Sequence, residues 1–290
     1  MHPLAAAAGT GLPLAATGLV LIAAVAHASW NAIAHDITDK LVGFTLLGLG
    51  GAACSIVVIV LAPPPDPSVW PLLLASTAVH IGYNVLLMTC YRLGDFSQVY
   101  PLARGTSPLV VTVLAAVFVR EVPAPLHLLG VIVISLGLAC LVFLGRRPSR
   151  AELPALAAAL GTGLAIAGYS TLDGIAVRRS GSPAGYTGWI ILLECLAIPS
   201  FALAYGRRPF LRRLRPHLWK GLAGGAISLL AYGLVLWAQT MGALASIAAL
   251  RESSIIVGAI IGTLFFHERF GRPRLISTIV VVAGIVALNL

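Results

Sequence analysis

The stretch VYPLARGTSPLVVTVLAAVFVRE, residues 99–121, decides the fold. It contains about twenty mostly apolar residues, the length of a helix that crosses the hydrocarbon core of a bilayer. A second stretch, AALRESSIIVGAIIGTLFFHE at residues 248–268, has the same plan. Each stretch has an arginine inside the apolar run and a glutamate at its end. Because a charge inside a membrane span is costly, two stretches with this plan indicate a membrane protein with an internal repeat.

The two stretches align at an offset of 147 residues. A shorter match lies near the start of each half, where NAIA at 31–34 aligns with DGIA at 173–176 at an offset of 142. Apolar segments resemble each other easily by chance, whereas charged residues are rare in this chain, so the paired arginines and glutamates are the most informative. The aligned pairs are Arg104 with Arg251, Thr106 with Ser253, Ser107 with Ser254, Glu121 with Glu268, Leu128 with Leu275, Ile132 with Ile279 and Gly137 with Gly284.

The composition agrees with a membrane protein. Of 290 residues, 59% are hydrophobic and only 10% are charged, too few charges to cover a soluble surface. Soluble globular, disordered and disulfide-scaffold classes are therefore excluded. The net charge of +9 comes mostly from scattered arginines that form no basic stripe, so nucleic acid is not expected as a partner. The expected environment is the lipid bilayer.

Apolar runs of about 20 residues, bounded by polar residues or by proline and glycine, predict ten transmembrane helices. Runs of this length favour helices over the alternating strands of a membrane barrel, which are about ten residues long. The predicted fold class is an all-α membrane protein. The predicted spans are 15–35, 41–62, 69–91, 97–119, 125–145, 154–177, 184–205, 218–239, 244–266 and 273–290.

The repeat defines the predicted domain organisation: a first five-helix repeat at 1–145, a linker at 146–153 and a second five-helix repeat at 154–290. Because five is odd, the second copy must be inverted in the membrane. Inverted repeats are typical of secondary transporters, which place the substrate site near the bilayer midplane between the repeats. Ten helices suffice for a complete pathway in a monomer, and a homodimer is the alternative.

The basic residues predict which side of the membrane each loop faces. One set of loops carries 14 arginines and lysines and the opposite set carries 3. The loops rich in positive charge are expected on the cytoplasmic side. With an even number of helices, both termini then lie outside, in a multi-pass protein of the plasma (inner) membrane.

Four segments give the chain a family resemblance: HASWNAIAHD at 27–36, VYPLARGTSPLVV at 99–111, YSTLDGIAVR at 169–178 and AALRESSIIVGAIIGTLFFHERFG at 248–271. They resemble the EamA-type family of the drug/metabolite transporter superfamily, in two copies that cover essentially the whole chain. The resemblance implies a ten-helix fold and secondary transport, usually export, of a small solute such as an amino acid, metabolite or drug, often coupled to protons. No GxxxxGK[ST] motif is present, so ATP is not expected as the direct driver. No cofactor is expected.

Two of the five charges inside predicted spans are the repeated arginines, Arg104 and Arg251. One interpretation is that both face a central cavity and bind a carboxylate or another anionic group of the substrate. The alternative is a structural clamp, in which each arginine pairs with an acid or with helix ends. Glu252 follows Arg251 directly and points about 100° away from it on a helix, so it is expected to pair with another helix and is also a candidate for proton coupling.

Asp173, in the sixth span, is the leading candidate for proton coupling. Burial disfavours its charged form and a nearby arginine favours it, a balance that suits a proton carrier. Tyr169 lies one turn before it, and the repeat places Asn31 and His27 in the same relation. The alternative is a hydrogen-bonded contact between helices. Glu194, in the seventh span, is either a second proton site or a partner of Arg178 or Arg179.

His80, Tyr83 and Asn84 lie at i, i+3 and i+4 of the third span, which makes one polar stripe on a helix. Together with Trp30 and Tyr232 they are candidates to line an aromatic substrate cavity. For each aromatic side chain the alternative is ordinary packing or a place at the membrane interface. A lone histidine such as His80 is more often a satisfied core residue than a metal ligand, and without a clustered His/Cys motif no metal site is expected.

Two other classes of protein compete with a transporter. An intramembrane enzyme would need a motif such as GxSxG, HExxH or paired aspartates in spans, and the sequence has none of these. A non-transporting or sensory membrane protein would predict that the polar span residues are dispensable. The sequence itself does not decide between transport and this last alternative.

Overall fold

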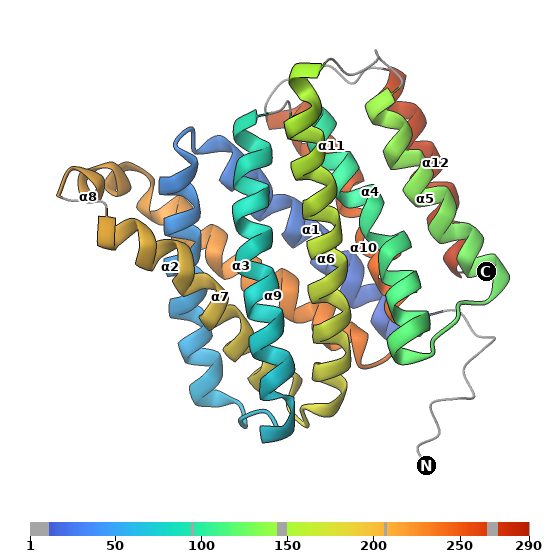
Figure 1. Cartoon of the computed structure of the whole chain (residues 1–290), viewed down its shortest axis with the longest axis horizontal. Coiled ribbons are helices and arrows are strands. Elements are labelled where there is room, and N and C mark those ends of the chain that lie inside the picture. Colours follow the sequence, from blue (N-terminus) through green and yellow to red (C-terminus); the bar gives the residue numbers. More distant parts are fainter. Residues whose placement is uncertain (1–11, 94–95, 144–149, 206–207, 266–271, 290) are drawn as a thin grey trace.

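The computed structural model describes residues 12–93, 96–143, 150–205, 208–265 and 272–289. Within these ranges the chain forms a bundle of helices and no strand (Figure 1). The α-helices are α1 (Leu14–Asp36), α2 (Lys40–Leu61), α3 (Trp70–Leu93), α4 (Phe96–Leu114), α5 (Pro125–Phe143), α6 (Leu153–Arg179), α7 (Pro183–Tyr205), α8 (Arg208–Leu214), α9 (Leu218–Gln239), α10 (Leu244–Arg251), α11 (Ser254–Phe265) and α12 (Arg272–Asn289).

The predicted spans agree with these helices to within a few residues, with three differences. The fourth span ends as a π-helix at Ala115–Val119, after which Arg120 adopts a left-handed conformation with φ 60°. The loop between the seventh and eighth predicted spans contains the additional short helix α8, which was not expected. The fold class predicted from the sequence is confirmed at the level of an all-helical membrane protein.

The ninth predicted span, 244–266, was wrong as a single helix. It is divided into α10 and α11 by a turn at Glu252 and Ser253. The backbone N–H groups of these two residues donate to Ala249 O at 3.1 Å and Leu250 O at 3.0 Å. These are i to i−3 bonds in place of the α-helical i to i−4 bonds, so the chain tightens and the helix axis is interrupted at this point.

Seven helices in the described ranges are long and apolar enough to cross a membrane, and Pro125–Leu138 is a shorter apolar helix. The prediction of ten spans is therefore supported in part. One local cause of the shortfall is the break in the ninth segment, which leaves α10 and α11 each too short to cross a membrane alone.

Aspartates begin the helical segments that follow two of the loops. Asp39 accepts a hydrogen bond from Val42 N at 3.3 Å and caps α2. Asp66 accepts one from Ser68 N at 2.8 Å, at the start of the short 3-10 helix Pro67–Val69 that leads into α3. The side-chain and backbone hydrogen bonds of Ser68 lower the pKa of the Asp66 carboxyl. A side-chain oxygen that accepts from the first free N–H groups fixes where a helix starts.

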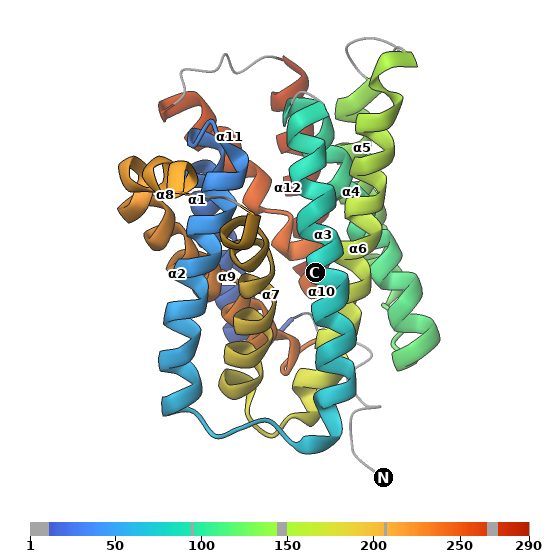
Figure 2. The same ribbon diagram turned by 60° about the vertical axis from the view of Figure 1, so that its left-hand side comes forward.

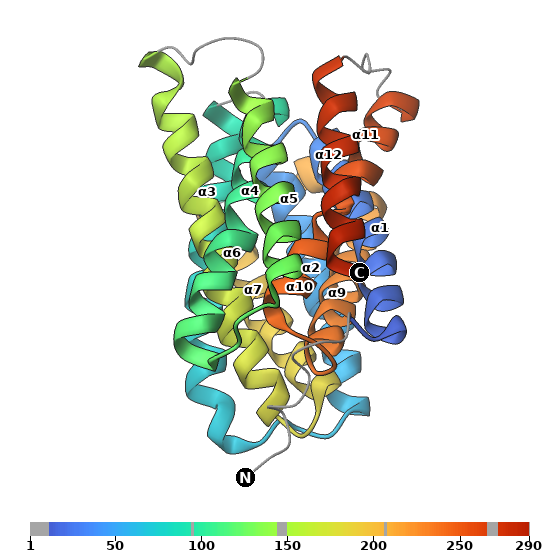
Figure 3. The ribbon, with the colours of Figure 1, turned by 90° about the vertical axis from the view of Figure 1, so that its right-hand side faces the viewer.

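The long helices pack in a regular set of pairs. α1 packs on α9, α3 on α6, α2 on α7 and α5 on α12. Figure 2 shows α2 and α7 together on one flank of the bundle, and Figure 3 shows α5 beside α12. Large apolar side chains such as Val60, Phe118 and Phe201 project outward. An apolar exterior of this kind is suited to lipid rather than to water.

Candidate substrate and proton site

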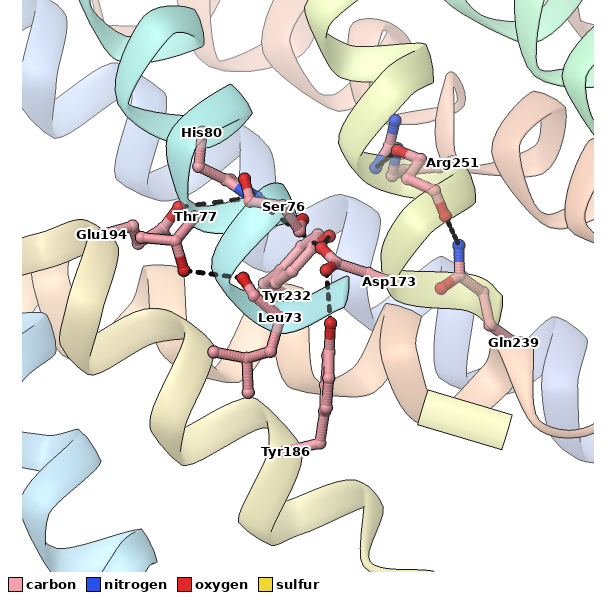
Figure 4. A network of polar contacts seen from close by, with 11 residues as sticks. Leu73, Ser76, Thr77, His80, Asp173, Tyr186, Glu194, Tyr232, Gln239 and Arg251 are labelled. Atoms are coloured by element: carbon pink, nitrogen blue, oxygen red, sulfur yellow. Dashed lines mark hydrogen bonds and ion pairs between the residues drawn. The ribbon is translucent and has the colours of Figure 1, made fainter. Parts of the chain in front are cut away.

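Asp173 is the centre of a buried polar network. Its carboxylate comes from the middle of α6 and is fully buried. The hydroxyl of Tyr186 on α7 donates to Oδ1 at 2.6 Å, and that of Tyr232 on α9 donates to Oδ2 at 2.5 Å. Figure 4 shows the Tyr186 hydroxyl directed at this carboxylate. Two O–H donors replace part of the water that a carboxylate loses on burial, so the structure accommodates a charge there.

His80 on α3 joins this aspartate to a second acid. Its Nδ1 lies 3.9 Å from Asp173 Oδ2, and its Nε2 lies 3.4 Å from Glu194 Oε2 on α7. The Nδ1 atom also lies 3.1 Å from the carbonyl oxygen of Ser76, one turn earlier. The imidazole therefore stands between two carboxylates from different helices. The group is a candidate for proton coupling, because histidine and carboxyl side chains are the usual proton carriers in proteins.

Aromatic rings surround the histidine. Tyr169 on α6 stacks on the His80 ring with centroids 3.8 Å apart and planes at 22°. Tyr232 meets the same ring edge-on at 5.4 Å, and Tyr83 meets Tyr169 edge-on at 5.4 Å. The structure thus brings four predicted site residues from three helices into one group. Asn84, the third member of the predicted stripe on α3, is half-buried and takes no part in the hydrogen bonds described for this group.

A second polar centre surrounds Arg104 on α4. Its Nε donates to Glu252 Oε2 at 2.8 Å and its Nη2 donates to Ser254 Oγ at 2.9 Å. Nη2 also lies 3.4 Å from the carbonyl oxygen of Arg251. Glu252 therefore pairs with another helix, as expected from its place beside Arg251. This ion pair links α4 of the first half to the turn between α10 and α11 of the second.

α1 contributes three predicted residues to the same centre. Nη1 of Arg104 lies 3.0 Å from His27 Nε2, and the Trp30 indole donates to His27 Nδ1 at 3.2 Å. The Asn31 amide donates to the His27 carbonyl oxygen at 2.8 Å. His27, and Trp30 through it, therefore lie beside the arginine, while the Asn31 amide binds the backbone of its own helix; Tyr83, Tyr169 and Tyr232 gather around His80. The single aromatic cavity expected from the sequence is divided between two centres.

Arg251, at the end of α10, is placed differently from Arg104. Its side chain is buried, with 3% of the residue exposed. Nη1 makes one long hydrogen bond, 3.5 Å to Ser170 Oγ, while Nε and Nη2 have no hydrogen-bond partner within the described residues. In Figure 4 Arg251 lies on the opposite side of Asp173 from His80 and Glu194.

Pairing with Arg178 or Arg179 was one of the two alternatives for Glu194, and Arg178, at the last turn of α6, is not its partner. Arg178 pairs with Glu121, the residue after the left-handed Arg120. Its Nε and Nη2 donate to the carbonyl oxygens of Gln239 at 2.6 Å and Gly242 at 2.5 Å. The five-residue advance of Arg178 beyond Asp173 explains the difference, because it places the arginine at the end of the bundle while Glu194 lies deeper, beside His80.

Sequence reasoning missed Tyr186 and Ser254 as site residues. Tyr186 follows Pro183 at the start of a span, where a tyrosine normally indicates the membrane interface. A better signal was available: α6 and α7 form a hairpin around residues 180–182, which places Tyr186 at a depth comparable to that of Asp173. Glu268, the repeat partner of Glu121, lies outside the described residues.

The fold and the buried charges define the class, a multi-pass helical membrane protein with polar centres between its spans. Residues 153–290 match the EamA-like transporter family. The resemblance to this family of the drug/metabolite transporter superfamily, indicated by the sequence motifs, is thereby confirmed over the second half of the chain. Members of the family are transporters rather than enzymes.

The crystal structure of another protein has a similar fold, with a TM-score of 0.68. The similarity covers 94% of this chain and 97% of the other, at 15% identity. At this identity the likeness supports the fold alone. A comparison with curated protein sequences finds no match.

Proposed function

We propose that the protein is a secondary active transporter that exports a small metabolite, such as an amino acid or a drug-like solute, across the plasma membrane in exchange for protons. The observation that best supports this proposal is the Asp173 network. A fully buried carboxylate in a spanning helix contacts side chains from α3, α7 and α9. Ionisable residues inside a membrane are expensive and mark ion or substrate pathways.

Protons are the coupling ion that this network suits. His80 stands between Asp173 and Glu194, so the three side chains form a relay of acid, imidazole and acid across α6, α3 and α7. Relays of Asp, Glu and His are used by pumps and transporters for protons. Glu252, the third proton candidate, is engaged by Arg104, and we assign it to structure instead.

The helix packing supports the inverted repeat. If each half contributes five spans, a two-fold axis that exchanges the halves maps the first span onto the sixth and the third onto the eighth. A contact between the first and eighth spans then implies an equivalent contact between the sixth and third spans. These are the observed pairs α1 with α9 and α6 with α3. The same two-fold axis maps the contact of α2 with α7 onto itself, and likewise the contact of α5 with α12. An inverted repeat provides the two rocking halves of alternating access.

The aligned glycines of the two halves lie at this last interface. A Cβ atom at Gly137 on α5 would lie 2.4 Å from Val280 on α12, and one at Gly284 on α12 would lie 2.5 Å from Ile134 on α5. Each glycine therefore allows close approach of the other helix. The two aligned glycines, Gly137 and Gly284, thus each make room for a side chain of the opposite helix, as expected if a two-fold axis passes through this contact.

The orientation follows from the loop charges. The loops rich in arginine and lysine face the cytoplasm in our proposal, with both termini outside. Arg178, Glu121 and the α9–α10 connection then lie at the outer end, where their contacts close the bundle. Release of these contacts would open the outer side during export.

Flux in proteoliposomes tests the proposal. The full-length protein is reconstituted with a trapped pH-sensitive dye, and a panel of amino acids and other small metabolites is applied under an imposed pH gradient. We expect proton movement that depends on one or more solutes, and its loss in Asp173→Asn, which keeps the hydrogen-bonding shape but cannot carry a proton. Arg212→Gln on α8, at an exposed surface position, is the matched control. A folded protein that moves neither solute nor protons would instead support a sensory role.

A further inference from the structure

Arg251 has a free binding edge inside the protein. In the planar guanidinium, Nε and Nη2 lie on one edge and present two parallel N–H groups, the arrangement that pairs with both oxygens of a carboxylate. These are the two nitrogens of Arg251 without a hydrogen-bond partner within the described ranges. A buried charge is costly unless it is paired, so this edge calls for an anion that the described part of the chain does not supply.

In Arg104, the same Nε and Nη2 edge of the guanidinium is occupied by side chains of the protein itself. There Nε meets Glu252 Oε2 at 2.8 Å and Nη2 meets Ser254 Oγ at 2.9 Å. The two arginines are repeat partners. One copy of the repeated position therefore binds an internal carboxylate, while the other copy has no equivalent partner among the residues that the structure describes.

The surroundings of Arg251 are a second, independent observation. Eight buried side-chain nitrogen and oxygen atoms in the described residues lack a hydrogen-bond partner, and four of them belong to residues 251–253. They are Nε and Nη2 of Arg251, Oε1 of Glu252 and Oγ of Ser253. These residues interrupt the ninth span. Interrupted helices with polar groups near the bilayer midplane form the substrate sites of many transporters.

The acids that could balance the charge of Arg251 are already engaged. Glu252 interacts electrostatically with Arg251, but its Oε2 is bound by Arg104. Both carboxylate oxygens of Asp173 accept tyrosine hydroxyls. Among the ion pairs of the described residues, Asp173 has His80 as its partner rather than Arg251. No acid of the described residues thus occupies the Nε and Nη2 edge of Arg251, which leaves this edge available to a bound anion.

We propose that Arg251 binds the carboxylate of the transported solute through its Nε and Nη2 groups, which rests on the transport function proposed above and narrows its substrates to carboxylates. One guanidinium matches the single charge and the planar, two-oxygen shape of this group. An amide of the same size presents only one acceptor and no charge. Arg104, by contrast, holds the two halves of the molecule together.

Stability without solute tests the structural basis. Thermal unfolding of the purified full-length protein in detergent is compared for Arg251→Gln, Arg104→Gln and the surface control Arg212→Gln. We expect Arg251→Gln to leave the Tm unchanged or to raise it by a few degrees, because it removes an unpaired buried charge. Arg104→Gln is expected to lower the Tm by several degrees. An equal loss in both variants would show that Arg251 has a structural partner and would overturn the proposal.

Binding of defined probes tests the ligand class. The probes are acetate, lactate, benzoate and L-leucine, each paired with its amide, and the readout is the rise in Tm with probe concentration. We expect at least one acid to stabilise the protein more than its amide, with an apparent Kd that rises roughly 30-fold or more in Arg251→Gln. Arg251→Lys should be intermediate, because it keeps the charge but not the paired edge. Equal effects of acids and amides, or acid binding that survives in Arg251→Gln, would contradict the proposal.

The same variants separate this inference from the proposed function. Acid binding that depends on Arg251 without any solute flux would retain the binding site and refute transport. Proton-coupled flux of solutes whose acid and amide forms are carried equally, in wild type and Arg251→Gln alike, would retain transport and refute the carboxylate site.

Discussion

Arg104 and Arg251 occupy the same position in the two halves of the chain, and their surroundings are opposite. Arg104 uses every nitrogen of its guanidinium, on Glu252, Ser254, the Arg251 carbonyl and His27. Within the described part of the chain, the Arg251 side chain has a single long hydrogen bond, to Ser170. Equivalence in sequence therefore does not mean equivalence in role. In an inverted repeat, one copy of a costly residue can stabilise the assembly while the other remains available for a ligand.

The cause of the difference is one residue. Glu252 follows Arg251 directly, and the first half has Gly105 at the corresponding place. The carboxylate of the second half contacts the arginine of the first half, and the first half has no acid at the aligned position. The difference between the two arginines is thus visible in the sequence as one acidic residue, Glu252, that aligns with an uncharged residue in the first half.

The largest expected effect comes from breaking the Arg104–Glu252 pair. Both side chains are buried, so Arg104→Gln leaves a buried carboxylate without its cation and should lower the free energy of unfolding by about 3–5 kcal/mol. Glu252→Gln should be similarly harmful, and the double variant Arg104→Gln/Glu252→Gln should recover a large part of the loss. Denaturant unfolding in detergent measures all three. Additive losses in the double variant would show that the pair is not coupled.

A smaller effect is expected at the end of the bundle, where Arg178 is partly exposed. Arg178→Gln removes the ion pair to Glu121 and the two bonds to backbone carbonyls, and should cost about 1–2 kcal/mol. Arg179→Gln, at the neighbouring exposed position, is the matched control. In flux assays the Arg178 variant should also open the outer side more readily and leak protons. A variant with normal stability and no leak would remove this contact from the mechanism.

The smallest effect distinguishes the paired serines. Ser254 Oγ accepts from Arg104, whereas the hydroxyl of its repeat partner Ser107 has no hydrogen-bond partner in the described structure. Ser254→Ala should therefore cost about 1.5 kcal/mol, the lower range for a hydrogen bond to a charged group, and Ser107→Ala should be close to neutral. Parallel thermal unfolding of the two variants is sufficient. Equal losses would mean that the two halves are more alike around their arginines than the hydrogen bonds indicate.

Most of the helix positions could be predicted from the sequence, because hydrophobic length directly reports the thickness of a bilayer. The eighth span, predicted at 218–239, is α9 with the same bounds. The break at Glu252 and Ser253 could not be predicted in this way. Neither residue is a proline or a glycine, and the interruption accompanies the tertiary contact of Glu252 with Arg104.

The site was predictable as a set of residues but not as a set of partners. Rare charges in apolar spans identified Asp173, Arg104 and Arg251, because each is too costly to be accidental. Which acid meets which base depends on how helices distant in the sequence are packed. His80 illustrates this limit: its position on α3 was visible, while its place between acids of α6 and α7 required the fold.

The contacts of Arg178 have a consequence for timing. The Arg178 side chain contacts Glu121 and the carbonyl oxygens of Gln239 and Gly242. A single side chain thus holds the segments that follow α4 and α9 against α6. Three bonds that share one guanidinium are lost together when that group swings away. These segments should therefore separate from α6 in a single step. In the proposed transport cycle, the rate of that step would limit the turnover.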